Sequence, residues 1–362
     1  MKGMYYKNIG VTVALLLCTL MVFAQNERSK RWDKTYDLSP TGKVHIENKY
    51  GNVVINGWER NQVRVSISIE VNHRKDESAE KLLDRIQPKA IQAGNFIQFI
   101  SEIKDRDANI FAKYFSKANP FDFDKSNVQI DYEVYLPINA ELNITNKFGD
   151  IIIDSWKGDL ETDLQHGDIY INGNISTAKV DMRFGKFHAR NLDYGNLKMD
   201  NGSIDIDKAQ KLKIISSGSD IRLGEISDLE LYSSKDEVEL ESVDALRGDF
   251  KFSNADIASV TNELFLTLRI AEIDIKRISS SNANINIVQE SSEINVDITG
   301  MAFDFRATLE QGLLRVPKTF TNINTQVTNE GSKIREITAK YGTGERGSFS
   351  INGIKGVIVL TD

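Results

Sequence analysis

A strand pattern that returns about every 18 residues constrains this chain more than any other feature. From Gly149 onward, a turn residue is followed by an apolar-x-apolar triplet. The first apolar members lie 18, 18, 17, 17, 17, 19, 16 and 21 residues apart, and they are Ile151, Ile169, Phe187, Ile204, Ile221, Val238, Ile257, Ile273 and Ile294. The residues between the two apolar members are mostly polar, and this alternation is typical of a strand with one buried face.

A second alternating pair precedes most of the turns, so that each unit contains at least two short strands. We assign to these pairs, among others, Val180 with Met182, Leu197 with Met199, and Phe250 with Phe252. One unit is too small to bury its apolar residues alone, whereas units stacked about 4.8 Å apart cover one another. The pattern therefore predicts a mainly β chain, a right-handed parallel β-solenoid with rungs of about 18 residues. An up-and-down barrel or a sandwich is the structural alternative.

Two segments that are far apart in the sequence nearly copy each other. Residues 48–58 and 146–156 are identical at five of eleven positions. Because internal repetition of this kind decides architecture, it supports the solenoid interpretation. We assign residues 141–362 to the solenoid repeat domain and expect about three further rungs between 300 and 362.

The region before the solenoid has a different pattern. Residues 76–86 are predicted to be helical, because Ala79, Leu82, Leu83 and Ile86 fall on one helix face, and Pro88 follows. An exposed solenoid end is an open sheet edge that needs covering. We therefore interpret residues 25–140 as a β-rich capping region with one short helix.

Glycines recur at the corners of the predicted rungs. Glycine adopts a positive φ without steric cost, and neighbouring Asn and Asp tolerate the same backbone. We expect a structural role in the turns for Gly51, Gly149, Gly167, Gly185, Gly202 and Gly218.

The first 24 residues have the layout of a secretory signal peptide. Lys2 and Lys7 precede an apolar run over 11–23, which is too short to span a membrane as a helix. We expect cleavage between Ala24 and Gln25, and therefore an exported protein of the periplasm, the cell surface or the medium. No second long apolar run follows, so no transmembrane span is predicted after cleavage.

Cysteine content and net charge exclude several kinds of site and partner. Cys18 is the only cysteine and leaves with the signal peptide, so the mature chain has neither a disulfide nor a thiolate metal site. The formal net charge of −7 becomes −9 when Lys2 and Lys7 are removed (−7 − 2). A well-mixed acidic surface argues against nucleic acid as a partner.

Known catalytic and cofactor motifs are absent from the sequence, so we assign no catalytic, cofactor-binding or metal-binding residue. The four histidines lack metal-ligand spacing, and there is no Gly-x-Ser-x-Gly elbow. Acidic turns such as those of Asp150 and Asp168 offer the oxygen ligands that calcium prefers. Solvated corner aspartates are the simpler interpretation.

One outward-facing group resembles a catalytic arrangement in outline. Asp205, Arg222 and Glu239 fall at equivalent positions of successive rungs, so their side chains are expected to form a column on one sheet face. Glycan-cleaving β-helices use carboxylates, or carboxylates with basic groups, on such a face. A ladder of ion pairs between rungs is the simpler interpretation, and we prefer it.

Two further stretches carry a family resemblance. Residues 131–137 (DYEVYLP) and 142–151 (LNITNKFGDI) resemble the strands and the Gly-Asp-Ile turn of a family of secreted bacterial β-strand-repeat proteins, a domain of unknown function known as "putative adhesin". The resemblance extends from about Lys43 to the C-terminus. It implies an envelope location and a solenoid, and it supplies no catalytic residues.

These observations favour a non-catalytic binding protein, adhesin-like, of the cell envelope or secreted. Its partner is expected to be a glycan, an envelope component or another protein. Two alternatives stay open: a carbohydrate-active β-helix enzyme that acts on polysaccharide, and a periplasmic accessory factor of an envelope regulatory system.

Overall fold

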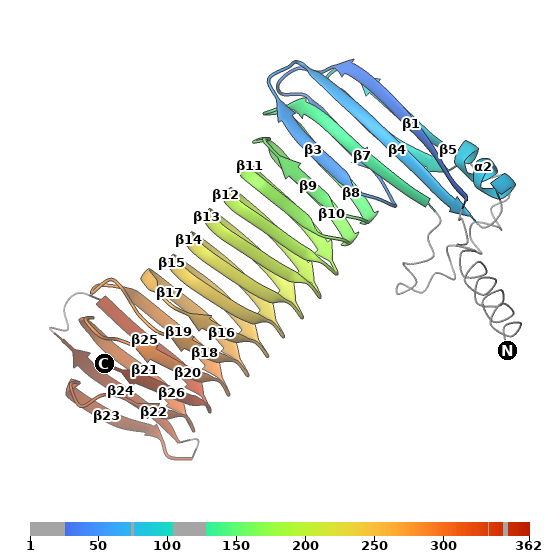
Figure 1. The fold of residues 1–362 in the computed structure, drawn as a ribbon. Coiled ribbons are helices and arrows are strands. Elements are labelled where there is room, and N and C mark those ends of the chain that lie inside the picture. The colour runs from blue at the N-terminus through green and yellow to red at the C-terminus, as the bar shows by residue number, and fades with distance from the viewer. Residues whose placement is uncertain (1–25, 74–75, 104–127, 332, 343–346) are drawn as a thin grey trace, which may run out of the picture. The chain divides into compact units, whose positions relative to one another are not determined.

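The structure of the 362-residue chain is a computed structural model. It describes residues 26–73, 76–103, 128–331, 333–342 and 347–362 (Figure 1). The predicted signal peptide and its cleavage site lie outside these residues. The described chain is mainly β, with 26 strands in one sheet and one helix.

The elements follow one another with short connections. The N-terminal elements are β1 (Asn26–Asp37), β2 (Lys43–Glu47), β3 (Val53–Trp58), β4 (Gln62–His73), α2 (Asp76–Arg85), β5 (Ile86–Ala93), β6 (Phe96–Ile103) and β7 (Val128–Pro137). The middle strands are β8 (Glu141–Phe148), β9 (Ile151–Asp154), β10 (Asp159–His166), β11 (Ile169–Arg183), β12 (Lys186–Asp200), β13 (Ser203–Ser217), β14 (Asp220–Ser234), β15 (Glu237–Lys251), β16 (Asn254–Ile257), β17 (Val260–Arg269), β18 (Glu272–Ile275), β19 (Asn284–Glu290) and β20 (Glu293–Asp297). The C-terminal strands are β21 (Phe303–Glu310), β22 (Leu313–Arg315), β23 (Thr321–Asn329), β24 (Ile334–Tyr341), β25 (Gly347–Ile354) and β26 (Val357–Thr361).

The chain divides into two compact units. The smaller comprises Met1–Arg31, Ser68–Gln87 and Glu102–Gln129, and the larger comprises Trp32–Ile67, Pro88–Ser101 and Ile130–Asp362. The smaller unit contains α2, in which Ala79 and Leu83 are buried on the predicted helix face. Lys30 fixes the adjoining strand to this helix, because its Nζ donates to the Leu83 carbonyl at 2.6 Å.

The larger unit consists mostly of parallel strands stacked side by side, as the run from β11 to β15 shows in Figure 1. Ile169 pairs with Phe187, and Phe187 pairs with Ile204, each in parallel register. This confirms the prediction that these three residues are neighbours in adjacent strands. Since successive strands run in parallel here, the up-and-down alternative is wrong for this part of the chain.

The core of this unit is a set of apolar rows that run from strand to strand. In β14, for example, Ile221, Leu223, Ile226, Leu229 and Leu231 are at most 3% exposed. Each pairs with an apolar or small residue of the strands on either side. At about 25 cal/mol per Å² of apolar surface, this repeated burial is the main force that holds the stack together.

One predicted position in these rows is wrong by two residues. Val238 pairs with Ala255, and Leu240 pairs with Ile257, so that Ile257 is the second member of its triplet and not the first. Ala255 is 5% exposed and occupies the inward position. Its side chain is too small to stand out in an apolar pattern, which explains the misplacement.

A second misplacement lies in β15. Phe250 and Phe252 were predicted as an inward pair. The inward residues of this part of the strand are instead Leu246, Gly248 and Phe250, and Phe252 is 53% exposed. A Cβ on Gly248 would lie 2.4 Å from the ring of Phe250, so the ring fills the space that a side chain would need. An inward glycine is invisible to an apolar pattern.

Close backbone approach at the corners requires glycine. Gly149 and Gly167 have φ values of 123° and 140°, and a Cβ on either would lie 2.2 Å from the carbonyl oxygen of the glycine in the preceding coil. That oxygen belongs to Gly51 for the first and to Gly149 for the second. These corners therefore need both the left-handed backbone and the absence of a side chain.

Two of the predicted corner glycines differ from this description. Gly202 is not among the residues with positive φ, and only close packing constrains it, at 2.3 Å from the Gly185 carbonyl oxygen. Gly218 has a φ of 65° but lies one position before the corner column, the stack of equivalent turn residues that includes Gly185 and Gly202. Ser219 takes the place in this column that is equivalent to Gly202. The equivalence shows in the hydrogen bonds: the Gly202 carbonyl accepts from the Asp220 amide, and the Ser219 carbonyl accepts from the Glu237 amide, 18 positions later in each case.

The near-copy segments of the sequence lie directly side by side. Val53 pairs with Ile151, and Ile55 pairs with Ile153, although β3 and β9 are separated in the chain by β4 to β8. On its other edge β3 pairs with β7. The first copy is therefore inserted between two segments that come later in the sequence.

The C-terminus is inserted in the same way. β25 lies between β19 and β21, and β26 lies between β20 and β22, all in parallel register. β24 then pairs antiparallel with β21, and β23 pairs antiparallel with β24. About three further rungs were expected between 300 and 362; the pair β21 and β22 stacks in parallel there on the pair β25 and β26, but out of sequence order, and β23 and β24 are antiparallel.

Candidate functional site

The predicted column of charges is present as a set of register neighbours. Asp205 pairs with Arg222, and Arg222 pairs with Glu239. Arg222 Nε lies 3.4 Å from a Glu239 carboxylate oxygen, and the two side chains are 65% and 71% exposed. An ion pair this exposed to water contributes little to stability.

Asp205 contacts basic side chains of the preceding strand. A carboxylate oxygen lies 3.1 Å from Lys186 Nζ and 3.5 Å from His188 Nδ1. Partial burial raises the pKa of Asp205, but the hydrogen bonds and charges of Lys186 and His188 together outweigh it, and the pKa lies below its ordinary value. A carboxylate held ionised in this way is poorly suited to act as a general acid.

The acidic turns hold the backbone of the next coil. Asp150 accepts from the Asp168 amide through one carboxylate oxygen at 2.8 Å, and Asp168 accepts from the Lys186 amide at 2.8 Å. The side-chain oxygen of Asn52 accepts from the Asp150 amide in the same way, also at 2.8 Å. In the part of the chain that the structure describes, no group of three or more His, Cys, Asp or Glu side chains is placed to hold a metal ion.

A different surface gathers polar and aromatic side chains, and the sequence patterns did not single it out. Seven outward residues are register neighbours in an unbroken line across β14, β15, β17, β19, β25, β21 and β24. We call this line the C-terminal row; it consists of Glu230, Arg247, Phe265, Asn286, Ser350, Arg306 and Thr338. With strands about 4.8 Å apart, it spans roughly 30 Å.

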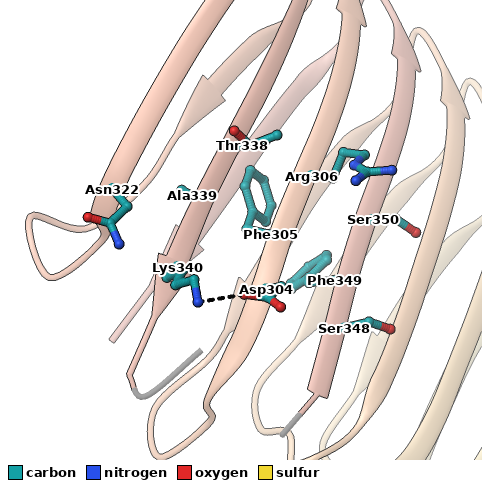
Figure 2. A pocket seen from close by; sticks show the side chains of 10 residues that line it. All are labelled: Asp304, Phe305, Arg306, Asn322, Thr338, Ala339, Lys340, Ser348, Phe349 and Ser350. Carbon is teal, nitrogen blue, oxygen red and sulfur yellow. Dashed lines mark ion pairs between the residues drawn. The ribbon is translucent and has the colours of Figure 1, made fainter. Parts of the chain in front are cut away.

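The first hollow on this face, of about 430 Å³, lies over β21 (Figure 2). Figure 2 shows Asp304 and Arg306 on this strand, with Lys340 and Thr338 on one side and Ser348 and Ser350 on the other. Lys340 Nζ lies 3.7 Å from Asp304, so these two charges partly cancel.

Arg306 differs from its neighbours in this hollow. Its side chain is exposed, and it lies in register between the hydroxyl residues Thr338 and Ser350. Among the described residues, no carboxylate lies within 4.0 Å of it. The hydroxyl of Ser350 has only a long bond, of 3.4 Å, to the Ile285 carbonyl. This arrangement presents a guanidinium fork flanked by hydroxyl groups to solvent.

The second hollow, of about 340 Å³, lies over β15 and β17 on the same face. Tyr232 is 42% exposed, and its hydroxyl donates to Glu230 at 2.6 Å. Hydrogen bonds from Tyr232 and then Lys213 lower the pKa of Glu230. Arg247 lies over the Phe265 ring at 5.9 Å from its centroid. The hollow is therefore lined by charged side chains that are in contact with aromatic residues, through a hydrogen bond in one case and a cation–π contact in the other.

The lining of this face offers several kinds of polar contact. The two hollows present hydroxyls, amides, aromatic rings and charged side chains, among them the carboxylates of Asp304 in the first and of Glu230 and Asp249 in the second. A polar ligand would meet hydrogen-bonding groups at nearly every strand of the row.

Comparison with known proteins gives structural neighbours only. No protein-family model and no curated protein matches the chain. A "putative adhesin" of Parabacteroides merdae is 9% identical, with a TM-score of 0.30, over 73% of this chain and 91% of that one. A "putative adhesin" of Bacteroides fragilis is 13% identical, with a TM-score of 0.25, over 91% of this chain and 97% of that one. A "putative lipid binding protein" of Parabacteroides distasonis is 11% identical, with a TM-score of 0.30, over 92% and 97%.

Several of these neighbours are the class of protein that the sequence resemblance named. TM-scores of 0.25 to 0.30 place no residue of this chain opposite a residue of those proteins, so the function is argued from the surface itself. No helix within the described ranges is long and apolar enough to cross a membrane.

Proposed function

We propose that the chain is a non-catalytic, adhesin-like binding protein of the bacterial envelope, whose C-terminal row holds an extended polar ligand such as a glycan. The observation that carries this proposal is the continuity of the row. Two hollows share one sheet face, and the line from Arg247 through Phe265, Asn286 and Ser350 to Arg306 crosses from one to the other without a break.

The physical basis is the match between a regular surface and a repeating ligand. Parallel strands offer a side chain about every 4.8 Å along the row. Half-buried aromatic rings such as Phe265 supply apolar contact with low loss of side-chain entropy, and the outward hydroxyl and amide groups of the row supply directional hydrogen bonds. A polymer of similar units gains from many such weak contacts at once.

The same proposal includes the finer features of the fold and of the compartment. We infer that the parallel strands of 141–362 form a right-handed solenoid with rungs of about 18 residues, and that 25–140, whose β2 and β3 pair with β8 and β9, covers its first rung. We also infer export, with cleavage between Ala24 and Gln25. The layout of the first 24 residues and the spacings of 17 and 18 between paired residues support these inferences.

The test is binding of the full chain to an array of immobilised bacterial and host polysaccharides. Arg306→Ala and Phe265→Ala are expected to lower the affinity by about tenfold each, from the loss of one to two kcal/mol of contact. Arg222→Ala is the matched control, because it removes another exposed arginine, from the charged column and not from the row. If all three variants lose affinity equally, the row is not the site.

The same measurements separate the enzymatic alternative. If the wild-type chain depolymerises a glycan, and the triple variant Asp205→Ala, Arg222→Ala, Glu239→Ala does not, the charged column is the functional site. If the wild-type chain binds without turnover, the non-catalytic proposal stands.

A further inference from the structure

The last strand of the stack, β23, has a composition that is unusual for a sheet edge. Within the described residues, it pairs with β24 alone, and Figure 1 shows it at the end of the C-terminal strands. Its nine residues, TNINTQVTN, include no charged residue and no proline, and all nine are exposed. Its outer edge therefore offers backbone N–H and C=O groups to another strand.

Natural sheet edges are usually protected against such pairing by charges, proline or short length. β1 has seven charged residues among its twelve, and β22 is only three residues long. β23 has none of these protections, although two irregularities in its pairing with β24 flank the stretch Asn324–Val327. The regular stretch between them is the part suited to accept a strand.

The sequence of β23 is complementary to itself. When two copies are placed antiparallel about Thr325, Asn324 faces Gln326 of the other copy within the regular stretch, and Ile323, at the irregularity just before it, comes opposite Val327. Ile323 and Val327 are the exposed apolar side chains of this strand, at 56% and 58%. The two-fold arrangement would bring these apolar residues together and the amides together.

We propose that β23 pairs antiparallel with β23 of a second copy of this chain, with the two-fold axis at Thr325. The pairing continues the sheet across the two copies through backbone hydrogen bonds, and the facing side chains set the register. Because one strand pair buries a small area, the dimer is expected to dissociate on dilution.

A single introduced cysteine tests both the pairing and the register. Cys18→Ser provides a cysteine-free background, in which Thr325→Cys places two thiols on the axis. Residues that face each other in antiparallel strands have Cα atoms about 4.5–5.5 Å apart, within the range that a disulfide bridges. Mild oxidation is expected to convert most of this variant to a covalent dimer.

Thr328→Cys on the same strand is the matched control. In the proposed register its two thiols lie roughly 20 Å apart, so it should stay monomeric on oxidation. Equal cross-linking of the two variants, or none at Thr325→Cys, overturns the proposal.

Charges introduced at Thr325 give an independent test, which is read by sedimentation. Thr325→Lys and Thr325→Asp each place like charges opposite one another, and each is expected to shift the chain from dimer to monomer. An equimolar mixture of the two should restore the dimer, because lysine then faces aspartate. The proposal is wrong if wild-type chain sediments as a monomer at every concentration, or if the mixture stays monomeric.

Discussion

At the scale of single residues, the corners of the stack are the places where one side chain decides the local structure. Glycine is needed where two backbones touch, and in later coils serine or aspartate occupies the equivalent position and hydrogen-bonds to the neighbouring coil. Asp236 shows the second case, since it is 1% exposed and accepts from the Ser219 amide and the Ser233 hydroxyl, each at 2.8 Å. The corner column is thus a row of small or hydrogen-bonded residues.

Substitution of one corner glycine tests the close approach. Gly167→Ala is expected to lower the free energy of unfolding by about 3 kcal/mol, because the new Cβ meets a carbonyl oxygen in a left-handed backbone. Gly173→Ala in the strand that follows, β11, is the control, since its Cβ would meet nothing closer than 3.8 Å. Urea unfolding followed by circular dichroism measures both. Equal midpoints for the two variants would contradict the account.

The buried carboxyl of Asp236 predicts a pH dependence of stability. Burial raises its pKa and outweighs the hydrogen bonds from Ser219 and Ser233. The folded chain therefore binds this proton more tightly than the unfolded chain does. The resulting stabilisation is fully present below the ordinary pKa of 3.8 and is lost as the pH rises through the folded-state pKa.

Asp236→Ser should remove this dependence, because serine occupies the same column at positions 219 and 253. The measurement is the unfolding free energy of both proteins from acidic to neutral pH. Wild type is expected to lose stability relative to the variant as the pH rises. A difference that stays constant, or that grows in favour of wild type, would contradict the assigned direction.

At the scale of elements, the inserted C-terminal strands decide how the last coils are held. Phe349 of β25 is 1% exposed, with its ring centroid 5.3 Å from that of Phe303 and 5.7 Å from that of Phe305. Both partners lie on β21, which precedes β25 in the chain. These two ring contacts of Phe349 therefore form only when the C-terminal segment returns into the stack.

Removal of that ring tests the insertion. Phe349→Ala should destabilise the chain by about 3–5 kcal/mol, as expected for a large buried side chain. Ile354→Ala on the same strand is the control and should cost under about 1 kcal/mol, because Ile354 is 48% exposed. Thermal unfolding of the two variants gives the comparison, and similar losses would argue against a buried, inserted β25.

The sequence predicted the middle elements better than the ends, for a physical reason. From Ile169 to Val238 every coil repeats the same inward residues, so the period reveals the register. The insertions of β3 and β25 depend on pairing between segments distant in the sequence, and no local pattern reports it. Ala255 and Gly248 were missed because an inward position with a small side chain, or with none, does not stand out in an apolar pattern.

At the scale of the whole molecule, the inward rows determine the fold, and the outward rows provide the surface for function. The charged column of Asp205, Arg222 and Glu239 was found from the sequence because it repeats with the rungs. The C-terminal row was not, because Arg306 and Ser350 become neighbours only through the inserted strand β25. Alternation of charged and buried residues over 303–307 was the one available signal, and it indicated an outward face without its partners.

The central claim is that one extended ligand lies along the C-terminal row, and a length series of oligosaccharides tests it most directly. Calorimetric titration with oligomers of the best-binding polysaccharide is expected to show affinity that rises with length until the oligomer spans the row, roughly 30 Å, and then levels off. Arg306→Ala should lower the affinity of long oligomers. The oligomer length at which the affinity levels off is then set by the remaining residues of the row. The claim is contradicted if a monosaccharide binds as tightly as the longest oligomer.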